Sequence, residues 1–370
     1  MDKKILITGG AGFIGSHTAV SLHESGYTPI IVDNFQNSDP CALKGIEAIC
    51  QRRMPFYEGD CGNRDFLSSV FAKEGNIAGV IHFAAYKAVN ESNQFPLNYY
   101  RNNIGSLITL LEVMAEYKVS NLVFSSSCTV YGSPEIIPVT EDTPIRETPS
   151  TYGKTKQICE AIIEDVVSRE SGIKGVLLRY FNPIGAHPSG LIGELPIGVP
   201  NNLVPFITQT ACGWRKQLTV FGGDYRTADG TCIRDFIHVV DLARAHIQAL
   251  RYMEKHPDCR LEKCNVGTGK GHSVLEIIQT FEHVSGECLA YTIGKRRDGD
   301  VEAVYADASK AGRLLGWHAE LTIEDAVRDA WNWQQRLMNN KEIVSSGIIK
   351  PPPDQKTASP ESSNRRPTTG

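Results

Sequence analysis

The sequence predicts an α/β protein: a doubly wound parallel-sheet Rossmann fold with a smaller C-terminal α/β substrate domain. Short β-branched runs alternate with longer helical patterns through the first half of the chain. The strand runs are continuously apolar, which is typical of a parallel sheet covered by helices on both faces. The 370 residues also exceed what a single core usually holds, so we expect two domains.

The first half contains five expected strands, each followed by a helical pattern or a turn. The strands are KKILIT (3–8), TPIIVDN (28–34), AGVIHFA (78–84), NLVFSSS (121–127) and KGVLLRYFN (174–182). The helices are expected from Gly12 onward and over residues 39–51, 97–117 and 152–170. Because parallel strands need long crossover connections, this order predicts helices on both faces of one sheet.

The regular alternation stops in a stretch rich in Gly and Pro, residues 183–205. A helix through Trp214 and a strand LTVF follow it, and a strand-turn-helix is expected over 233–253. The remaining expected elements are a strand CNVGT (264–268), a helix SVLEIIQTFEHV (273–284) and a strand AYTIG (290–294). The second half therefore reads as a smaller, interleaved domain.

Three regions are predicted from this pattern. Residues 1–181 form the Rossmann domain, which residues 235–262 rejoin, and residues 182–340 form the smaller, interleaved substrate domain. Residues 345–370 are rich in Pro, Ser, Thr and charge and poor in groups that pack, so we expect a disordered tail.

Composition excludes several classes of function. The formal net charge of -4, with 22% charged residues, provides no broad basic field for nucleic acid or an anionic membrane. The ten cysteines form neither a CxxC pair nor a Cys/His cluster, which argues against a metal site and for reduced thiols in a cytoplasmic protein. The N-terminus enters an apolar strand at once, leaving no room for a signal peptide, and no apolar run approaches the ~20 residues that span a bilayer.

A glycine-rich loop, TGGAGFIGSH, directly follows the first strand and opens a helix. Gly9, Gly12 and Gly15 have a GxxGxxG spacing, in which a side chain would block the tight turn and the approach of backbone N–H groups to a pyrophosphate. On its own the loop also fits a plain strand-to-helix turn. Asp33 stands 18 residues beyond Gly15 at the end of the second strand, where an acid binds a ribose 2′-hydroxyl, and it favours NAD over NADP.

Tyr152 and Lys156 lie four residues apart, which places them on one helix face. Tyrosine ionises near ~10, and lowering its pKa by ~3 units requires ~4 kcal/mol, which an ammonium and a positively charged nicotinamide could jointly supply. The spacing alone also fits an ordinary amphipathic helix. Ser127 ends the preceding strand and could present its hydroxyl to the same substrate oxygen, so together with the dinucleotide loop these residues indicate a hydride-transfer site.

Several segments resemble the UDP-glucose 4-epimerases, a group of the extended short-chain dehydrogenase/reductase family. They are TGGAGFIG, SSSCTVYG, YGKTK, RYFNPIGAHPSG, PNNLVPFI, FGGDYRTADGTCIRDFIHVVDLARAH and RRDGDVEAVYADASK, and the resemblance runs from about Ile5 to Trp333. It implies reversible 4-epimerisation of UDP-glucose and UDP-galactose through a transient 4-keto sugar, with tightly bound NAD. It also suggests a homodimer formed through the helices near 97–117 and 152–171.

The resemblance assigns roles to individual residues. It implies that Tyr152 is the base for the sugar 4-hydroxyl, that Lys156 tunes Tyr152 and holds the nicotinamide ribose, and that Ser127 shares the hydrogen bond. With the glycine loop and small strand-end residues, the implied cofactor contacts are Gly9, Gly12, Phe13, Ile14, Gly15, Asp33, Asn34, Asp60, Cys61, Phe83, Ala84, Lys87, Asn103, Tyr152, Lys156 and Phe181. The implied UDP-sugar contacts are Ser127, Asn182, Asn202, Leu203, Arg234, Arg297, Asp300 and Val304.

Val304 bears on the choice of sugar. In the resembled family a large aromatic at this position closes the pocket to an N-acetyl group and a small residue opens it, so valine predicts that UDP-GlcNAc and UDP-GalNAc are also accepted. A core valine that merely packs is the alternative.

Two rival functions share this fold. A nucleotide-sugar 4,6-dehydratase needs an Asp-Glu pair after the hydroxyl residue, and this chain has Cys128 and Thr129 there, so dehydration is disfavoured. A catalytically inactive dinucleotide-sensing protein would be expected to lose part of the Ser127, Tyr152 and Lys156 set, which this chain keeps.

Overall fold

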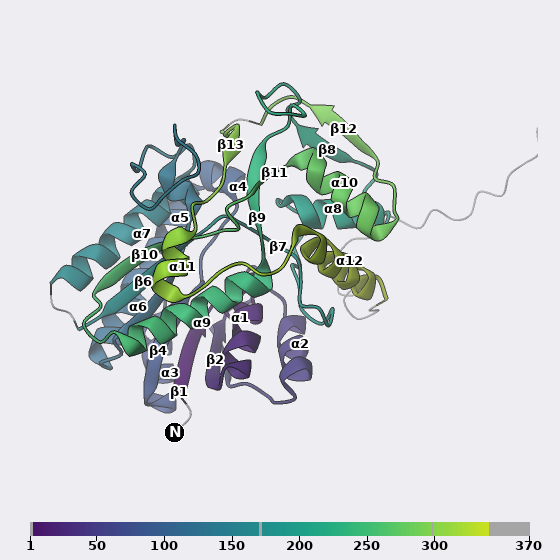
Figure 1. Ribbon diagram of the computed structural model, residues 1–370. Helices are drawn as coiled ribbons and strands as arrows, with labels where there is room; N and C mark the ends of the chain where they lie inside the picture. The colour runs from purple at the N-terminus through teal and green to yellow at the C-terminus, as the bar shows by residue number, and fades with distance from the viewer. Residues whose placement is uncertain (1–2, 170–171, 298, 340–370) are drawn as a thin grey trace, which may run out of the picture.

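Seven parallel strands form the central sheet of the computed structural model, which describes residues 3–169, 172–297 and 299–339 (Figure 1). Their order is β10-β6-β5-β4-β1-β2-β3. The strands are β1 (Lys3–Thr8), β2 (Tyr27–Asp33), β3 (Phe56–Glu58), β4 (Ile77–His82), β5 (Asn121–Ser127), β6 (Lys174–Tyr180) and β10 (Leu261–Val266). The predicted doubly wound sheet is confirmed, and the tail expected over 345–370 lies outside the described residues.

Helices cover both faces of this sheet because successive strand residues point to opposite sides. Ile5 and Ile7 of β1 join a core with α1 (Phe13–Glu24) and α9 (Val239–Lys255), whereas Leu6 joins the opposite core. The first face also carries α2 (Cys41–Cys50) and α11 (Ser309–Leu315), and the second carries α3 (Arg64–Glu74), α6 (Gly105–Glu116) and α7 (Thr151–Ser168).

A smaller unit packs against the carboxyl-end side of the sheet (Figure 1). Its strands are β7 (Asn182–Ile184), β9 (Ile233–His238), β11 (Gly271–Ser273) and β13 (Ala303–Val304) in one sheet and the pair β8 (Leu218–Phe221) and β12 (Tyr291–Gly294). The helices α8 (Leu203–Ala211), α10 (Val274–Ser285) and α12 (Ile323–Asn339) enclose its own apolar core. In that core the Phe281 and Trp331 rings meet edge to face at 5.5 Å.

The chain crosses between the two units more than once. After β9 it returns through α9 and β10, which pairs in parallel with β6 at the edge of the large sheet. α9 packs along α1 on the first face. The segment expected to rejoin the first domain, 235–262, thus lies mostly against the large sheet.

Some elements differ from the predicted ones. The single helix expected over 97–117 is divided into α5 (Pro96–Tyr99), a π-helical turn η1 (Tyr100–Ile104) and α6, with α4 (Val89–Gln94) before them. β3 and α3 were not predicted, and neither was α12. β7 begins at the last residue of the strand expected over 174–182 and extends into the stretch expected to be irregular.

Candidate active site

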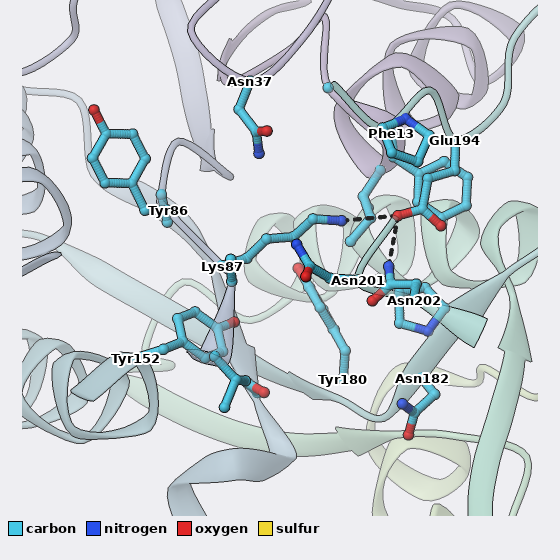
Figure 2. A pocket seen from close by; sticks show the side chains of 18 of the residues that line it. Phe13, Asn37, Tyr86, Lys87, Tyr152, Tyr180, Asn182, Glu194, Asn201 and Asn202 are labelled. Atoms are coloured by element: carbon cyan, nitrogen blue, oxygen red, sulfur yellow. Dashed lines mark hydrogen bonds and ion pairs between the residues drawn. The ribbon is translucent and has the colours of Figure 1, made fainter. Parts of the chain in front are cut away.

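A cavity of about 870 Å³ lies where the carboxyl ends of the large sheet face the smaller unit. Ligands of open α/β sheets bind at this edge. Its wall includes the glycine loop after β1, the ends of β2, β4 and β5, the start of α7, and the segment 192–203. Figure 2 shows side chains from both units, among them Phe13, Tyr152 and Asn182, around the same space.

The glycine loop needs glycine for steric reasons. Gly9 has φ +70°, and a Cβ there would lie 2.8 Å from the backbone nitrogen of Ala84 on the neighbouring strand end. A Cβ on Gly15 would overlap the carbonyl oxygen of Gly9. Gly12 is the N-cap of α1, whose first residues line the cavity, so the loop presents a helix N-terminus to an anionic group.

Asp33, at the end of β2, is buried and fixes the loop from the side. Its Oδ2 accepts a hydrogen bond from the backbone N–H of Ala11 at 2.9 Å, and its Oδ1 accepts from Ser38 Oγ at 2.7 Å and from the Phe35 N–H at 3.0 Å. The carboxylate still lines the cavity and retains acceptor capacity for a hydroxyl group.

Tyr152 is placed by the first turn of α7. Ser150 is the N-cap, and its Oγ accepts from the Gly153 N–H at 3.1 Å, while the Tyr152 N–H donates to Ser92 Oγ at 3.0 Å. The start of α7 is therefore anchored on both sides, which fixes the direction of the Tyr152 side chain into the cavity (Figure 2).

Lys156 follows one turn later and is fully buried. Its Nζ donates to the Ser125 carbonyl oxygen at 2.6 Å and lies 4.8 Å from the centre of the Phe124 ring and 5.9 Å from that of Tyr152. Burial lowers the pKa of Lys156 to about 8, so the ammonium remains mostly charged at neutral pH.

Burial raises the pKa of Tyr152 to about 12, and a hydrogen bond from Ser127 opposes this rise. The lowered tyrosine pKa that the Tyr/Lys spacing predicts is therefore not found in the protein alone. The reason is that desolvation of the phenolate outweighs the Ser127 hydrogen bond. To lower the pKa of Tyr152, additional positive charge beside the phenol is required.

The predicted UDP-sugar contacts all line the cavity. Asp300 joins the two arginines among them: Arg297 donates to its carboxylate through Nε at 3.1 Å and Nη2 at 2.8 Å, and Arg234 Nη2 lies 3.5 Å from Asp300 Oδ1. Val304 is buried in a cluster with Val130 and Phe181. Paired guanidinium groups of this kind suit a pyrophosphate.

The predicted cofactor contacts also line the cavity, except Asn103. Asn103 is buried behind the wall, where its Oδ1 accepts from the Tyr86 N–H at 2.8 Å and its Nδ2 donates to the Tyr86 carbonyl oxygen at 3.1 Å. Asn102, one residue earlier, lines the cavity instead. Both residues lie in a π-helical turn, which periodicity in the sequence does not indicate.

Other cavity residues were not selected from the sequence. Glu194 accepts from Lys87 Nζ at 3.1 Å and from Asn202 Nδ2 at 2.6 Å across the cavity (Figure 2). Thr129 lines the cavity with a buried hydroxyl that has no partner, and Tyr180 hydrogen-bonds His246. Glu194 stands in a Gly- and Pro-rich stretch, and only its charge among small residues could have indicated it.

Cys128 and Thr129, the two residues after Ser127, both line the cavity, and neither carries a carboxylate.

Within the described residues, no three His, Cys, Asp or Glu side chains are grouped so that they could hold a metal ion. In the same part of the chain, no helix has the length and apolar character needed to cross a membrane.

Comparison with known families and relatives covers most of the chain. The model of the NAD dependent epimerase/dehydratase family matches residues 5–267. The UDP-glucose 4-epimerase of Dictyostelium discoideum is 50% identical over 335 residues, which cover 90% of this chain and 96% of the relative. The human UDP-glucose 4-epimerase is 48% identical over 342 residues, which cover 91% of this chain and 97% of the relative.

Solved structures resemble this fold over most of the chain as well. A UDP-glucose 4-epimerase from Bifidobacterium longum, in complex with NAD+ and UDP, superposes with a TM-score of 0.86 at 47% identity. One from Stenotrophomonas maltophila, with bound NAD and formylated UDP-arabinopyranose, gives a TM-score of 0.88 at 44% identity. Each covers 91% of this chain and 99% of the matched chain.

Proposed function

The chain belongs to the NAD dependent epimerase/dehydratase family and, within it, to the UDP-glucose 4-epimerases, and we propose on that premise that it interconverts UDP-glucose and UDP-galactose. It is an isomerase that inverts sugar carbon 4. The observation that carries this function is that Ser127, Tyr152 and Lys156 line the same cavity as the glycine loop and the paired arginines. A proton-transfer group, a dinucleotide cradle and a pyrophosphate site thus share one space.

The cofactor is NAD, and the cavity fits it. Gly9 and Gly15 leave space that a Cβ would fill, and the N-terminus of α1 faces a diphosphate. Asp33 can accept from a ribose 2′-hydroxyl and would repel a 2′-phosphate. NAD, when bound, supplies the oxidising and reducing equivalents for sugar carbon 4.

The residues around the sugar act on its hydroxyl proton. Tyr152 takes the proton of the 4-hydroxyl when carbon 4 is oxidised to a ketone and returns it when the opposite face is reduced. Ser127 hydrogen-bonds Tyr152 and the same substrate oxygen. The Lys156 ammonium, 5.9 Å from the centre of the Tyr152 ring, is a positive charge of the kind that favours a phenolate. Arg234 and Arg297 hold the pyrophosphate, which leaves the sugar free to turn between the two steps.

Dehydration is the function that this site supports least. Elimination of water needs an acid beside the sugar, and the residues after Ser127 are a thiol and a hydroxyl. Burial also raises the pKa of the Cys128 thiol to about 12, so it is a poor proton donor. A purely sensing protein has no use for Ser127, Tyr152 and Lys156 placed together in one cavity.

Incubation of the purified protein with UDP-galactose and no added NAD, followed by NMR of the sugar products, tests the proposal. Formation of UDP-glucose is expected. A 4-keto-6-deoxy sugar would instead indicate a dehydratase, and no conversion would indicate the sensing role.

The substrate range is proposed to include UDP-GlcNAc and UDP-GalNAc. Val304 faces the cavity, and its neighbours Val130 and Phe181 are tightly packed, so its small side chain sets the space available beside the sugar. This rests on the size argument for valine at this position.

Each unit is proposed to hold one ligand, with residues 1–181 and 235–262 holding NAD and residues 182–340 holding the nucleotide sugar. Supporting this division, α9 and β10 pack with the large sheet. The arginine pair belongs to the smaller unit.

A homodimer through the helices near 97–117 and 152–171 is also proposed. Apolar side chains lie exposed on α4 to α6, and Leu97 is 71% exposed, which supports a covered surface there. Light scattering of the eluting protein should give twice the chain mass, and Leu97→Glu should shift the measured mass toward that of the monomer.

All ten cysteines are free thiols, which supports action in the cytoplasm and can be checked by imaging a fluorescent fusion.

A further inference from the structure

Glu194 links two sides of the cavity that are assigned to different ligands. Its Oε1 accepts from Lys87 Nζ at 3.1 Å and from Asn202 Nδ2 at 2.6 Å. Lys87 follows β4 on the cofactor side, and Asn202 is the N-cap of α8 on the sugar side. One carboxylate oxygen therefore joins the two halves of the site (Figure 2).

The backbone of Glu194 is fixed by the last helix. The Trp333 indole N–H of α12 donates to the Glu194 carbonyl oxygen at 3.0 Å, and a Cβ on Gly193 would meet the Trp333 ring. This close contact requires glycine at position 193. It sets the point from which the Glu194 side chain extends into the cavity.

The Lys87 end is fixed as well. The preceding residue, Tyr86, has both backbone groups bonded to the Asn103 side chain. Asn103 is anchored in turn, because its Nδ2 donates to Thr155 Oγ1 of α7 at 3.0 Å. The helix that carries Tyr152 and the segment that carries Glu194 are thus connected through Lys87.

The electrostatic setting favours this contact. The Glu194 side chain is 11% exposed and Lys87 is 49% exposed, so the pair is partly shielded from water on the carboxylate side. Charge-assisted hydrogen bonds are the stronger kind, and a carboxylate that accepts two donors holds both in place. Without it, Asn202 loses its partner and Lys87 gains rotameric freedom.

We propose that Glu194 is a positioning residue: by holding Lys87 and Asn202 at fixed places across the cavity, it preorganises the site for the nucleotide sugar. This rests on the proposed function. Loss of such a bond to a charged group is expected to weaken substrate binding about 10-fold, while the proton-transfer groups stay in place.

The test compares Glu194→Ala, which removes both contacts, with Glu194→Gln, which keeps an oxygen acceptor for Asn202 and removes the charge. In the NAD-loaded enzyme, Glu194→Ala should raise KM for UDP-galactose about 10-fold with kcat within about 3-fold. Calorimetric titration with UDP should show the same loss of affinity. Glu194→Gln should fall between the wild type and Glu194→Ala.

A double-mutant cycle with Lys87→Met distinguishes positioning from a structural role. If the pair acts as a unit, Lys87→Met/Glu194→Gln should lose little more UDP affinity than the worse single variant. If Glu194 had only a structural role, Glu194→Gln would instead lower Tm, and the losses of UDP affinity in the two single variants would multiply in the double variant. Glu47→Gln, an exposed carboxylate on α2 outside the cavity, serves as the matched control.

The proposal would be overturned if Glu194→Ala kept the wild-type KM and UDP affinity. It would also be overturned if the losses of UDP affinity in the double-mutant cycle were strictly multiplicative. The two proposals fail separately: if the wild-type protein binds UDP but converts no UDP-galactose, the catalytic function is wrong, and the UDP titrations still decide the role of Glu194.

Discussion

Lys156 donates a hydrogen bond to the carbonyl oxygen of Ser125, 2.6 Å from its Nζ, at the end of the strand that leads to Ser127. This bond ties the α7 lysine to β5, so the ammonium and the Ser127 hydroxyl approach Tyr152 from one rigid support. The Phe124 ring beneath the ammonium adds a cation–π contact at 4.8 Å. The group proposed to transfer the proton is therefore held by a helix and a strand rather than by a loop.

Tyr152→Phe should reduce turnover of UDP-galactose by ~100-fold or more, because only the phenolic hydroxyl is removed and general-base catalysis is typically worth at least that much. NAD content, measured after denaturation, should remain near the wild-type level. Tyr291→Phe, at an exposed position on β12, is the matched control. Near-normal turnover in Tyr152→Phe would contradict the assignment of the base.

Val304→Tyr should abolish most activity on UDP-GalNAc and preserve that on UDP-galactose, since the added ring fills the space beside the sugar. The ratio of the two rates, each measured with purified enzyme, is the relevant quantity. Val304→Ala should leave this ratio close to that of the wild type. An unchanged ratio in Val304→Tyr would mean that Val304 only packs.

Arg179→Met should lower the free energy of unfolding by about 3–5 kcal/mol, because it leaves the Glu160 carboxylate buried without its positively charged partner. The two side chains are 1% and 2% exposed and lie 2.6 Å apart. Urea denaturation would measure the change. Arg328→Met, which breaks an exposed pair with Asp325, should cost no more than about 1 kcal/mol.

Acid should destabilise the protein through histidines buried in the neutral form. Burial lowers the pKa of His17, His82 and His246 to about 3, from an ordinary value of 6.5. Below pH 6.5 the unfolded chain binds protons that the folded protein does not, so stability falls as the pH falls from 6.5 toward 3.

His246→Gln should therefore reduce the slope of unfolding free energy against pH by about 1.4 kcal/mol per pH unit within that window. Urea titrations at pH 6 and pH 5 would measure it. His256→Gln, just after the end of α9 at an exposed position, controls for loss of a histidine outside the core. Equal slopes for His246→Gln and the wild type would show that His246 is not buried in the neutral form.

The fold was predictable where a strand or helix is long enough to show a clear pattern of apolar residues. Strands β1, β2, β4, β5 and β6 and helices α1, α7, α9 and α10 follow from continuous apolar runs and helical periodicity. β3 has only three residues, too few to form a pattern, and α3 follows it without a preceding strand signal. Short elements depend on contacts that only the folded sheet provides.

The site was predictable where several signals occur together in one chain. The glycine loop and the Tyr152/Lys156 spacing each also fit an ordinary turn or helix, but with Asp33 and Ser127 they indicate a dinucleotide site, and these residues all line the cavity. Glu194 could not be found this way, since its partners lie 107 and 8 residues away and meet only after folding.

The sign of the Tyr152 pKa shift also required the structure. The i, i+4 lysine and a positively charged nicotinamide together indicate a lowered pKa, whereas in the protein alone burial raises the pKa of Tyr152. Sequence spacing reports neighbours along the helix and contains no measure of how much water is removed around them.

The position of β10 at the edge of the large sheet has a consequence for synthesis. β6 ends at Tyr180, but its outer edge is paired only when Leu261–Val266 has been made, about 80 residues later. Until then a nascent chain on the ribosome carries an open strand edge, of the kind that promotes misassociation. The large sheet should thus complete its folding only after much of the smaller unit has emerged, which makes the order of translation part of how this enzyme reaches its native state.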